Sequence, residues 1–292
     1  RGLPPLHSTH YEQNNGAVVR LIGPRRKEAL VMSYHFDQIP QYPDLAGKVA
    51  VVTGGSHGIG SVTCRILAAN DAKVVVNGRD RDAIDTVVAK IRSEGGTAIG
   101  VAADCADVAA IERMRQQVEQ ELGPVNVLAT FAGGPAIPAP TLQLTAEQWR
   151  SVVDSNLTAT FLTLKSFVPG MIERQSGSVV TISSSGGRIP EMGAPAPYVA
   201  AKAGIQMLSR RLAGEVGEYG VRINCVAPAS ILTERVQRLM PEAQQQQAAA
   251  SYPLRRLGKP EDVALAILFL ASDASSWLTG VTLDVAGGRV ML

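Results

Sequence analysis

Runs of consecutive apolar residues alternate with helix-like stretches from Lys48 to the end of the chain. The apolar runs read KVAVVTGG, AKVVVNGRD, TAIGVAAD, VNVLATFAGG, GSVVTISSS, VRINCVAP and GVTLDVAGG. Segments with helical periodicity, such as residues 59–70, AIDTVVAKIRSEGG, IERMRQQVEQEL and VALAILFLAS, separate most of them. Unbroken Val- and Ala-rich runs are typical of parallel strands that helices cover on both faces. We therefore predict an α/β fold: a three-layer, doubly wound sheet of about seven parallel strands in a single domain.

Two stretches depart from this rhythm. Residues 1–46 have no sustained period and are rich in Pro, Gly, Asn and Gln, so we expect an N-terminal extension or arm before a catalytic domain at 47–292. The chain does not begin with Met, and a start at Met32 would make the residues up to 31 a leader. The Gln-rich segment 242–253 predicts a helical excursion within a substrate loop at about 230–257.

Composition narrows the class of protein. The 292 residues have a net charge of +2 and are 46% hydrophobic, so nothing favours nucleic acid or an anionic membrane as a partner. No apolar run is long enough to span a bilayer. The cysteines Cys64, Cys105 and Cys225 are scattered without metal-ligand spacing, which favours a reducing compartment and predicts no metal site. We expect a cytoplasmic protein.

A glycine-rich turn follows the first predicted strand. In TGGSHGIG, Gly54, Gly58 and Gly60 have the spacing G-x-x-x-G-x-G at the point where the first helix begins. A turn without side chains lets a phosphate approach the free N–H groups and the partial positive charge of a helix N-terminus. Such a turn is weak as a lone signal, but its place in a β-α-β unit predicts dinucleotide binding.

The end of the second predicted strand bears on the choice of nicotinamide cofactor. An acidic residue there would accept hydrogen bonds from the ribose hydroxyls and repel a 2′-phosphate. The chain instead reads Asn77-Gly78-Arg79, with no acid before Asp80. The Arg79 guanidinium can pair with a phosphate, and His57 could add a donor. We therefore expect NADP(H), with NAD(H) as the less favoured alternative. Asp104, at the end of the third strand, could accept from the adenine amino group.

The stretch YVAAK places Tyr198 and Lys202 one helical turn apart, on the same helix face. A Tyr hydroxyl has a pKa of about 10 and is a poor proton-transfer group at neutral pH until a cation stabilises its anion. Lys202 could supply that cation. Spacing alone equally fits a half-buried Tyr and a solvated Lys.

The order of the motifs resembles that of the short-chain dehydrogenase/reductase family. From about Leu45 to Gly288, TGGSHGIG, NVLATFAGG, DSN, ISSS, YVAAK, VRINCVAPA, RRLGKPEDVA and LTGVTLDVAGG occur in the family's order. Within the family the chain is most similar to ketoreductases of the 3-oxoacyl-carrier-protein type. The resemblance implies a Rossmann-like fold and carbonyl reduction that is reversible as alcohol oxidation.

The resemblance also implies roles for individual residues. Tyr198 would be the general acid in reduction, Lys202 would lower its pKa and bind the nicotinamide ribose, a Ser would polarise the carbonyl, and Asn156 would hold a water linked to Lys202. The implied cofactor-binding residues are Gly54, Ser56, His57, Gly58, Ile59, Gly60, Arg79, Asp104, Cys105, Ala132, Gly133, Tyr198, Lys202, Pro228, Ile231 and Thr233.

Two points in the motif match remain open. The family commonly has its Ser thirteen positions before the Tyr, which selects Ser185, whereas aligning ISSSGG selects Ser184 with a loop one residue longer. We prefer Ser184. The chain also has Phe131 where the family usually has Asn, and Ala229 where it has Gly. The loss of Asn puts the hydrogen bonding around Phe131 in doubt.

The substrate side is expected at residues 135–138, 188–197 and after Thr233. The apolar residues there, Ile137, Ile189, Met192, Leu239 and Met240, suggest a largely apolar ketone or acyl thioester, although such residues also simply pack loops. Arg235 and Arg238 could meet an acidic group or form a solvated helix face. The stripe Ile205, Leu208, Leu212 and Val216 fits either sheet packing or an interface, so a homotetramer or dimer is implied by the resemblance alone.

Three alternatives remain. One is an NAD-dependent dehydrogenase of a secondary alcohol such as a sugar or steroid. A second is reduction of a carbon–carbon double bond, which the Ser and the Tyr-Lys pair make less favoured. The third is a nucleotide-binding sensor or scaffold without turnover. Such a protein would be expected to have lost Tyr198 or Lys202, and this chain has both.

Overall fold

The structure is a computed structural model that describes residues 39–134, 139–191 and 193–291. These residues belong to one compact unit, His35–Leu292. Expectations for residues 1–38, for the substrate-side segment 135–138 and for Met192 lie outside the described residues.

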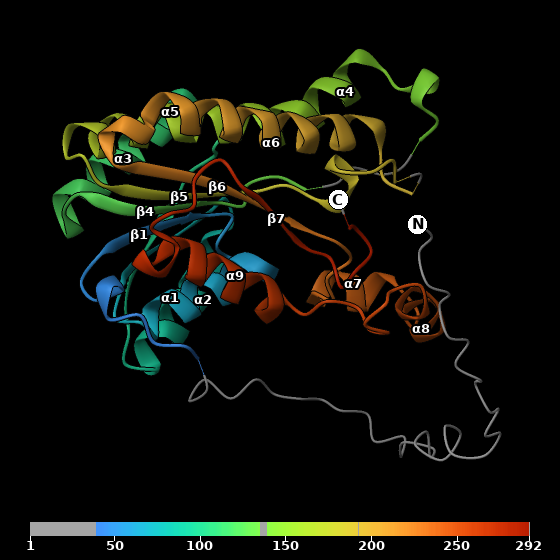
Figure 1. The fold of residues 1–292 in the computed structure, drawn as a ribbon, viewed down its shortest axis with the longest axis horizontal. Coiled ribbons are helices and arrows are strands. Elements are labelled where there is room, and N and C mark those ends of the chain that lie inside the picture. The colour runs from blue at the N-terminus through green and yellow to red at the C-terminus, as the bar shows by residue number, and fades with distance from the viewer. Residues whose placement is uncertain (1–38, 135–138, 192, 292) are drawn as a thin grey trace, which may run out of the picture. The chain divides into compact units, whose positions relative to one another are not determined.

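Within the described residues, seven strands form one sheet in the order β3-β2-β1-β4-β5-β6-β7 (Figure 1). Every neighbouring pair is parallel. The strands are β1 (Val49–Thr53), β2 (Lys73–Gly78), β3 (Thr97–Ala102), β4 (Val125–Thr130), β5 (Gly177–Ile182), β6 (Val221–Pro228) and β7 (Thr282–Val285). The chain moves outward from β1 to β3 and then returns to β4 on the other side of β1, so the predicted doubly wound sheet is confirmed.

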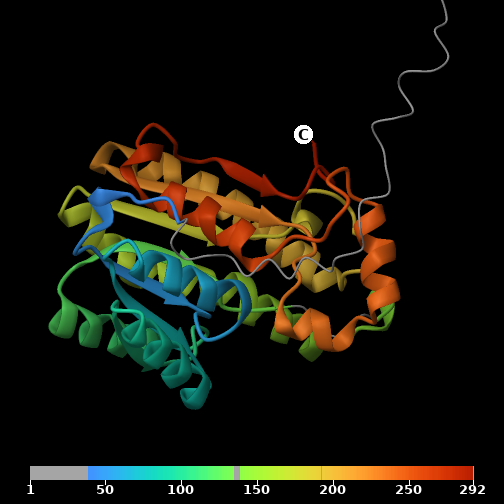
Figure 2. The ribbon, with the colours of Figure 1, turned by 90° about the horizontal axis from the view of Figure 1, so that it is seen from below.

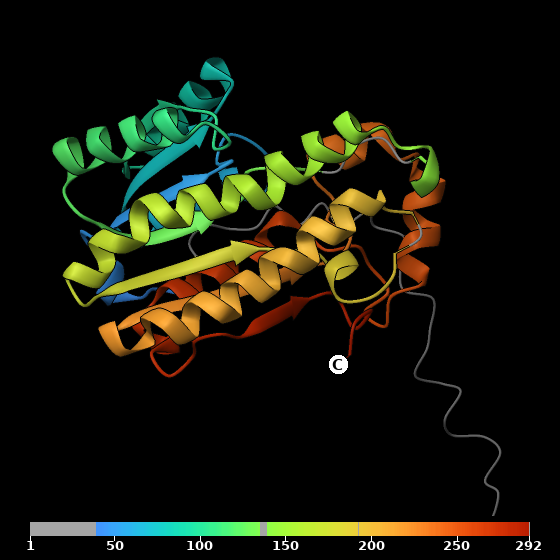
Figure 3. The same cartoon turned by 90° about the horizontal axis from the view of Figure 1, so that it is seen from above.

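Helices cover both faces of this sheet. The main ones are α1 (Gly58–Ala68), α2 (Arg81–Ser93), α3 (Val108–Leu122), α4 (Ala146–Val153), α5 (Ala159–Glu173), α6 (Ala196–Val216), α7 (Glu234–Leu239), α8 (Glu242–Ala250) and α9 (Pro260–Ala271). In Figure 1, α3, α5 and α6 lie on one face and α1, α2 and α9 on the other, and Figures 2 and 3 show these two layers from below and from above. The three-layer architecture follows from strands that are apolar on both faces.

Shorter turns complete the fold. The 3-10 turns among the described residues are η3 (Pro43–Leu45), η4 (Thr141–Gln143), η6 (Ser185–Gly187), η7 (Gly217–Tyr219) and η8 (Asp273–Ser275). A π-helical turn, η5 (Asp154–Thr158), joins α4 to α5. The Gln-rich excursion is helical, as predicted, and forms α8.

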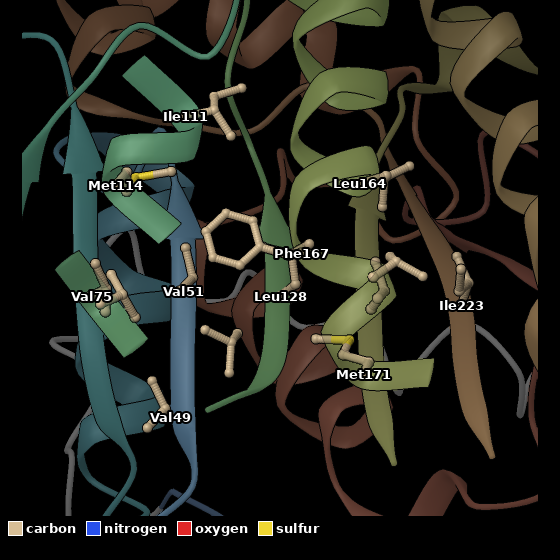
Figure 4. Close-up of a cluster of buried hydrophobic side chains, with 14 of the residues drawn as sticks. Val49, Val51, Val75, Ile111, Met114, Leu128, Leu164, Phe167, Met171 and Ile223 are labelled. Atoms are coloured by element: carbon tan, nitrogen blue, oxygen red, sulfur yellow. The ribbon is translucent and has the colours of Figure 1, made fainter. Parts of the chain in front are cut away.

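The core on the α3 and α5 side is continuous across the sheet. Figure 4 shows Ile111 and Met114 of α3, and Phe167 and Met171 of α5, packed over valines and leucines of the strands. All five positions of β1 are buried, as expected for a central strand of a covered parallel sheet. Burial at about 25 cal/mol per Å² of apolar surface makes this core the main source of stability.

The apolar stripe of α6 faces the sheet. Ile205 and Val216 are buried, and Leu208 and Leu212 are partly buried residues that pack against the core cluster. The sequence fits either packing on the sheet or a subunit interface for this stripe, and its contacts in the structure are those of packing on the sheet.

The described end of the N-terminal extension packs on the catalytic domain. Ile39 and Leu45 are buried, and the backbone N–H of Tyr42 donates to Asn70 Oδ1 at 2.7 Å. Residues 39–46 therefore form part of the compact unit, although their sequence lacks a regular period.

Candidate functional site

The glycine turn between β1 and α1 leaves no room for side chains. Gly54 and Gly58 have positive φ angles of 65° and 51°. A Cβ on Gly54 would lie 2.8 Å from the carbonyl carbon of Phe131, and one on Gly60 would lie 2.2 Å from the carbonyl oxygen of Gly54. At Gly54 and Gly60 a side chain would require a backbone shift, and at Gly58 the positive φ favours glycine. The first helix begins here without a side-chain cap from His57, so its N-terminus fits a phosphate.

Residues predicted for the adenosine end lie together beyond β2. Ser56 Oγ lies 3.0 Å from His57 Nδ1, and a Cβ on Gly78 would approach Ser56 Oγ to 2.7 Å. The Arg79 side chain is 79% exposed, and its Nη1 lies 3.8 Å from Asp104 Oδ2. The Arg79 guanidinium is thus available to an anion, and Asp104 is close enough to pair with it in place of that anion. The described residues at this strand end thus include one exposed cation and one carboxylate that could face a nucleotide.

Cys105 can serve the cofactor only through its backbone. Its side chain is buried, and Sγ donates to Asn77 Oδ1 at 3.3 Å. Desolvation raises the pKa of the thiol to about 11. Asn77 in turn donates from Nδ2 to the carbonyls of Val101 and Ala103 at 3.0 and 3.2 Å. These bonds tie the ends of β2 and β3 together beneath the predicted adenine position.

The Phe131 position keeps its link to the neighbouring strand. The Phe131 N–H donates to the Thr53 carbonyl at 3.0 Å, and the Ala132 N–H donates to Thr53 Oγ1 at 3.4 Å. These backbone bonds keep the strand ends joined, but they do not replace a side-chain amide, and the neighbouring Thr130 hydroxyl is buried without a partner among the described residues. Gly133 follows with a φ of 113° and packs against Asn156, since a Cβ there would lie 2.5 Å from Asn156 Oδ1.

Tyr198 and Lys202 lie on α6 in the predicted relation. The Lys202 ammonium is 5.5 Å from the centre of the Tyr198 ring and donates to the Ile182 carbonyl at 3.1 Å. Lys202 is buried, and desolvation lowers its pKa from 10.5 to about 8. Burial raises the pKa of Tyr198, a hydrogen bond with Ser184 lowers it, and the charge of Glu191 raises it. The sequence led us to expect a lowered Tyr198 pKa, but in the chain alone desolvation outweighs the effects that favour the anion.

Ser184 and Ser185 have different partners. Ser184 lies at the start of η6, where its hydroxyl lowers the pKa of Tyr198. Its Oγ also accepts from the Gly186 N–H at 3.2 Å. Ser185 is buried and donates to Glu191 Oε1 at 3.0 Å. The preferred residue, Ser184, is therefore the one beside the tyrosine hydroxyl, and Ser185 faces another group.

Asn156 sits in the π-helical turn η5. It is fully buried, and its Nδ2 donates to the carbonyls of Gly134 and Val152 at 3.1 and 2.9 Å. Among the described residues, no group bonds its Oδ1, which is buried. A buried, unpartnered acceptor carries a free-energy cost unless a further donor reaches it. π-turns often occur at functional sites, and this one gives Asn156 an acceptor with unused capacity.

The end of β6 brings the last predicted cofactor residues to the same sheet edge. Pro228 closes the strand, and Ile231 is buried and forms a bridge with Gly258. Thr233 caps α7 by accepting from the Val236 N–H at 3.4 Å. Its Cγ2 would be 3.2 Å from a Cβ on Gly58, so it overlies the glycine turn, where Ile59 also begins α1.

The substrate-side residues divide into exposed and structural ones. Leu239 is 70% exposed, and Arg235 and Arg238 lie exposed on α7. Arg188 instead pairs with Asp284 of β7, with contacts of 3.0 and 2.8 Å. Its guanidinium is thus occupied by the protein rather than free for substrate.

No motif in the sequence pointed to several of the groups around Tyr198. Ser183 and Gln206 bond each other beside Lys202, and Glu191 pairs with Arg289 from the C-terminal end. The residues that bond these groups are distant from them in the sequence. No local sequence pattern could therefore have predicted these contacts. Among the described residues there is no group of three or more His, Cys, Asp or Glu side chains that could hold a metal. None of the helices in the described part of the chain is long and apolar enough to cross a bilayer.

Comparison with known proteins agrees with this geometry. A family model described as enoyl-(acyl carrier protein) reductase matches residues 54–289. The chain is 39% identical over 251 residues to a 3-oxoacyl-[acyl-carrier-protein] reductase from Synechocystis sp., covering 85% of this chain and 98% of the relative. It is 35% identical to a 2,5-dichloro-2,5-cyclohexadiene-1,4-diol dehydrogenase from Sphingobium indicum, covering 84% and 96% of the two chains.

A solved structure is similar over almost the same range. The crystal structure of a 3-oxoacyl-[acyl-carrier protein] reductase from Brucella melitensis superposes with a TM-score of 0.83 at 28% identity, covering 92% of this chain and all of that one. Sequence relatives, fold and motif order agree, and the chain belongs to the short-chain dehydrogenase/reductase family of nicotinamide-dependent oxidoreductases.

Proposed function

We propose that this oxidoreductase uses NADPH to reduce a ketone on a largely apolar small molecule or acyl thioester to a secondary alcohol, reversibly. The contact of Tyr198 with both Ser184 and Lys202 carries the proposal. This arrangement provides a proton donor, a hydrogen-bond donor and a cation around one reacting oxygen.

The cofactor proposal rests on the end of β2. Gly78 and the exposed Arg79 stand where an acid would favour NAD, and His57 contacts Ser56, which lies beside Gly78. Gly54, Gly58 and Gly60 would hold the pyrophosphate at the start of α1, because they form the tight turn that leads into the N-terminus of this helix. Bound NADPH would supply the hydride.

The chain's own residues would handle the proton. Ser184 would donate a hydrogen bond to the carbonyl oxygen, and Tyr198 would give its proton to the oxygen as negative charge develops. Lys202 would stabilise the resulting phenolate, since its ammonium lies 5.5 Å from the ring centre. Asn156 Oδ1 would hold a water through which the proton is replaced.

Proton transfer of this kind contributes roughly 10²- to 10⁴-fold, and one hydrogen-bond donor to the developing charge contributes roughly 10²- to 10³-fold. In the oxidative direction Tyr198 would act as the base. The catalytic set we propose is thus Asn156, Ser184, Tyr198 and Lys202, with each residue in the role that the family resemblance implies.

Assembly and location belong to the same proposal. Phe161 of α5 and Met207 of α6 are 46% and 62% exposed on the face of these helices away from the sheet, which supports a homotetramer or dimer. The three cysteines are buried and unpaired, which supports a reducing, cytoplasmic location.

The first test is calorimetric titration with NADPH and with NADH. We expect tighter binding of NADPH and a loss of that preference in Arg79→Ala. Arg81→Ala is the matched control, because the Arg81 side chain is also largely exposed but pairs with Asp85 at 3.1 Å. Equal or tighter binding of NADH would favour the NAD-dependent alcohol dehydrogenase instead.

A panel of ketones, 3-oxoacyl thioesters and 2-enoyl thioesters then tests the reaction. We expect oxidation of NADPH with the carbonyl compounds. Turnover of the enoyl thioesters alone would favour reduction of a carbon–carbon double bond, the activity named in the description of the matching family model. Tight cofactor binding without turnover of any compound would favour the sensor or scaffold.

A further inference from the structure

Two ion pairs fasten the loop between Ser184 and Tyr198 to the C-terminal part of the chain. Arg188 pairs with Asp284 of β7 through two contacts, and both side chains are less than 20% exposed. Further along, Glu191 Oε1 lies 3.3 Å from Nε of Arg289. In Figures 1 and 3 the C-terminal end of the chain lies beside the yellow turn that precedes α6. The loop is therefore held in place by residues that lie about 100 positions later in the chain, Asp284 and Arg289.

The Glu191 carboxylate lies close to the proposed catalytic serine. Its Oε1 accepts from Ser185 at 3.0 Å, and its Oε2 would be 3.4 Å from a Cβ on Gly186. The same Cβ would be 3.7 Å from Ser184 Oγ. The Glu191 carboxylate and the Ser184 hydroxyl therefore both lie close to Gly186. Glu191 is only 20% exposed, which reduces the screening of its charge by water.

Arg289 has its own support. Its guanidinium lies 5.5 Å from the centre of the Tyr252 ring, and Tyr252 is buried with its hydroxyl bonded to the Ser230 N–H at 3.1 Å. The neighbouring Leu254 N–H donates to the Gly287 carbonyl at 3.3 Å. An arginine that stacks on a buried ring keeps its position at a small entropic cost. The Arg289 side chain is thus held by the Tyr252 ring, and the nearby backbone is held by the bond between Leu254 and Gly287.

The other ionisable groups near Tyr198 differ in role from the ion pair of Glu191 with Arg289. Lys202 faces the tyrosine ring from the same helix, and Cys225 lies behind Lys202 on β6. Arg188 and Asp284 neutralise each other through two hydrogen bonds. Glu191 is the acidic group whose charge acts on Tyr198, where it disfavours the phenolate. Arg289 is the cation that pairs with that acid.

We propose that Glu191 is a positioning residue of the catalytic centre, and that its ion pair with Arg289 fixes the Ser184 loop and balances the charge beside the Tyr198 hydroxyl. The proposal rests on the proposed function for its catalytic meaning. Its physical content, an acid that acts on the tyrosine and an arginine that pairs with that acid, holds without turnover.

The test follows the ionisation of Tyr198 directly. Phenolate absorbance is recorded against pH for each variant and for the same variant carrying Tyr198→Phe, and the difference isolates one of the six tyrosines. Glu191→Gln removes a negative charge and should move the midpoint to lower pH. Arg289→Gln leaves that charge unbalanced and should move the midpoint to higher pH. Each shift should be about half a pH unit or more.

Three further variants separate charge from structure. The double variant Glu191→Gln/Arg289→Gln should return close to the wild-type midpoint, and Arg289→Lys, which keeps the charge, should stay near it. Arg211→Gln is the control, because its pair with Glu215 lies on the exposed side of α6. Circular dichroism checks that each variant is folded.

Shifts in the same direction for both single variants, or no shift in either folded variant, would overturn the proposal. Opposite shifts in an enzyme that reduces no ketone would leave the charge pair standing and contradict the proposed function instead. With an active substrate, the midpoint of kcat against pH should move in the same two directions.

Discussion

The hydroxyl of Ser183 donates a hydrogen bond of 2.7 Å to the backbone carbonyl of Lys202. The same hydroxyl accepts a hydrogen bond of 2.7 Å from Gln206 Nε2. All three residues are buried, and they join the end of β5 to the helix that carries Tyr198. The backbone that holds the Ser184 hydroxyl is thus tied to the backbone that holds the lysine.

This relationship predicts the stability of Ser183→Ala. The substitution removes one hydrogen bond to Lys202 and leaves the buried Gln206 amide without its partner, so we expect unfolding to become easier by about 1–3 kcal/mol. Adding Gln206→Leu removes the orphaned amide and should recover part of the loss. Urea denaturation measures both effects. Ser93→Ala, at an exposed serine that bonds the Lys90 carbonyl, should change the stability by less than about 0.5 kcal/mol.

Much of the fold could be predicted because its determinants are local. Each apolar run became a strand, since Val- and Ala-rich segments such as β1 are buried on both faces. Helix starts also carried local signals: Asp80 and Asp107 cap α2 and α3 with their side chains. The parallel order then follows from the strand–helix alternation.

The site could be predicted only in part. The motif order led to Tyr198, Lys202 and Asn156, but it left Ser184 and Ser185 unresolved because a loop of uncertain alignment separates them from the tyrosine. The pairing of Arg188 with Asp284 joins residues 96 positions apart, and no local pattern encodes it. Arg188 therefore looked like a substrate-side residue from its position in the sequence.

Burial of Lys202 predicts a pH-dependent cost to stability. Its pKa falls from 10.5 to about 8 in the folded chain, so the unfolded chain binds the proton more tightly. The free energy of unfolding should therefore rise with pH between these two values, and below pH 8 the cost is complete, on the order of 3 kcal/mol.

Lys202→Met removes this cost together with a hydrogen bond to Ile182. We expect the variant to be more stable than the wild type at pH 7 by about 1–3 kcal/mol, with the difference shrinking as the pH rises towards 10.5. Denaturation at several pH values checks this. Lys90→Met, at a lysine 56% exposed on α2, should show no such trend. A difference that stays constant with pH would contradict a lowered lysine pKa.

Two glycines should respond in opposite ways to alanine. Gly60→Ala places a Cβ 2.2 Å from the Gly54 carbonyl oxygen, so it should distort the turn and weaken NADPH binding at least tenfold, about 1.4 kcal/mol. Gly214→Ala, on α6, meets nothing within 4 Å and should stabilise the fold by about 0.5–1 kcal/mol. Calorimetry with NADPH and thermal denaturation separate the two effects. Unchanged cofactor affinity in Gly60→Ala would place the phosphate elsewhere.

Tyr198→Phe tests the proton donor. The ring and its packing against Lys202 remain, so we expect cofactor binding to stay within a few-fold and kcat for ketone reduction to fall by roughly 10²- to 10⁴-fold. Tyr219→Phe, at a tyrosine 38% exposed near the far end of α6, is the matched control. Full activity in Tyr198→Phe would mean that another group supplies the proton.

Replacing each of the two neighbouring serines by alanine distinguishes their roles. The Ser184 hydroxyl acts on Tyr198, so Ser184→Ala should lower kcat for ketone reduction by roughly 10²- to 10³-fold, the effect of losing one donor to the developing charge. Ser185 donates to Glu191 instead, and Ser185→Ala should lower kcat by less than about tenfold while loosening the loop. Because both variants lose a single hydroxyl, the comparison needs no correction for size. A larger loss in Ser185→Ala would mean that the loop shifts by one residue when substrate binds, and that Ser185 then takes the place beside the tyrosine.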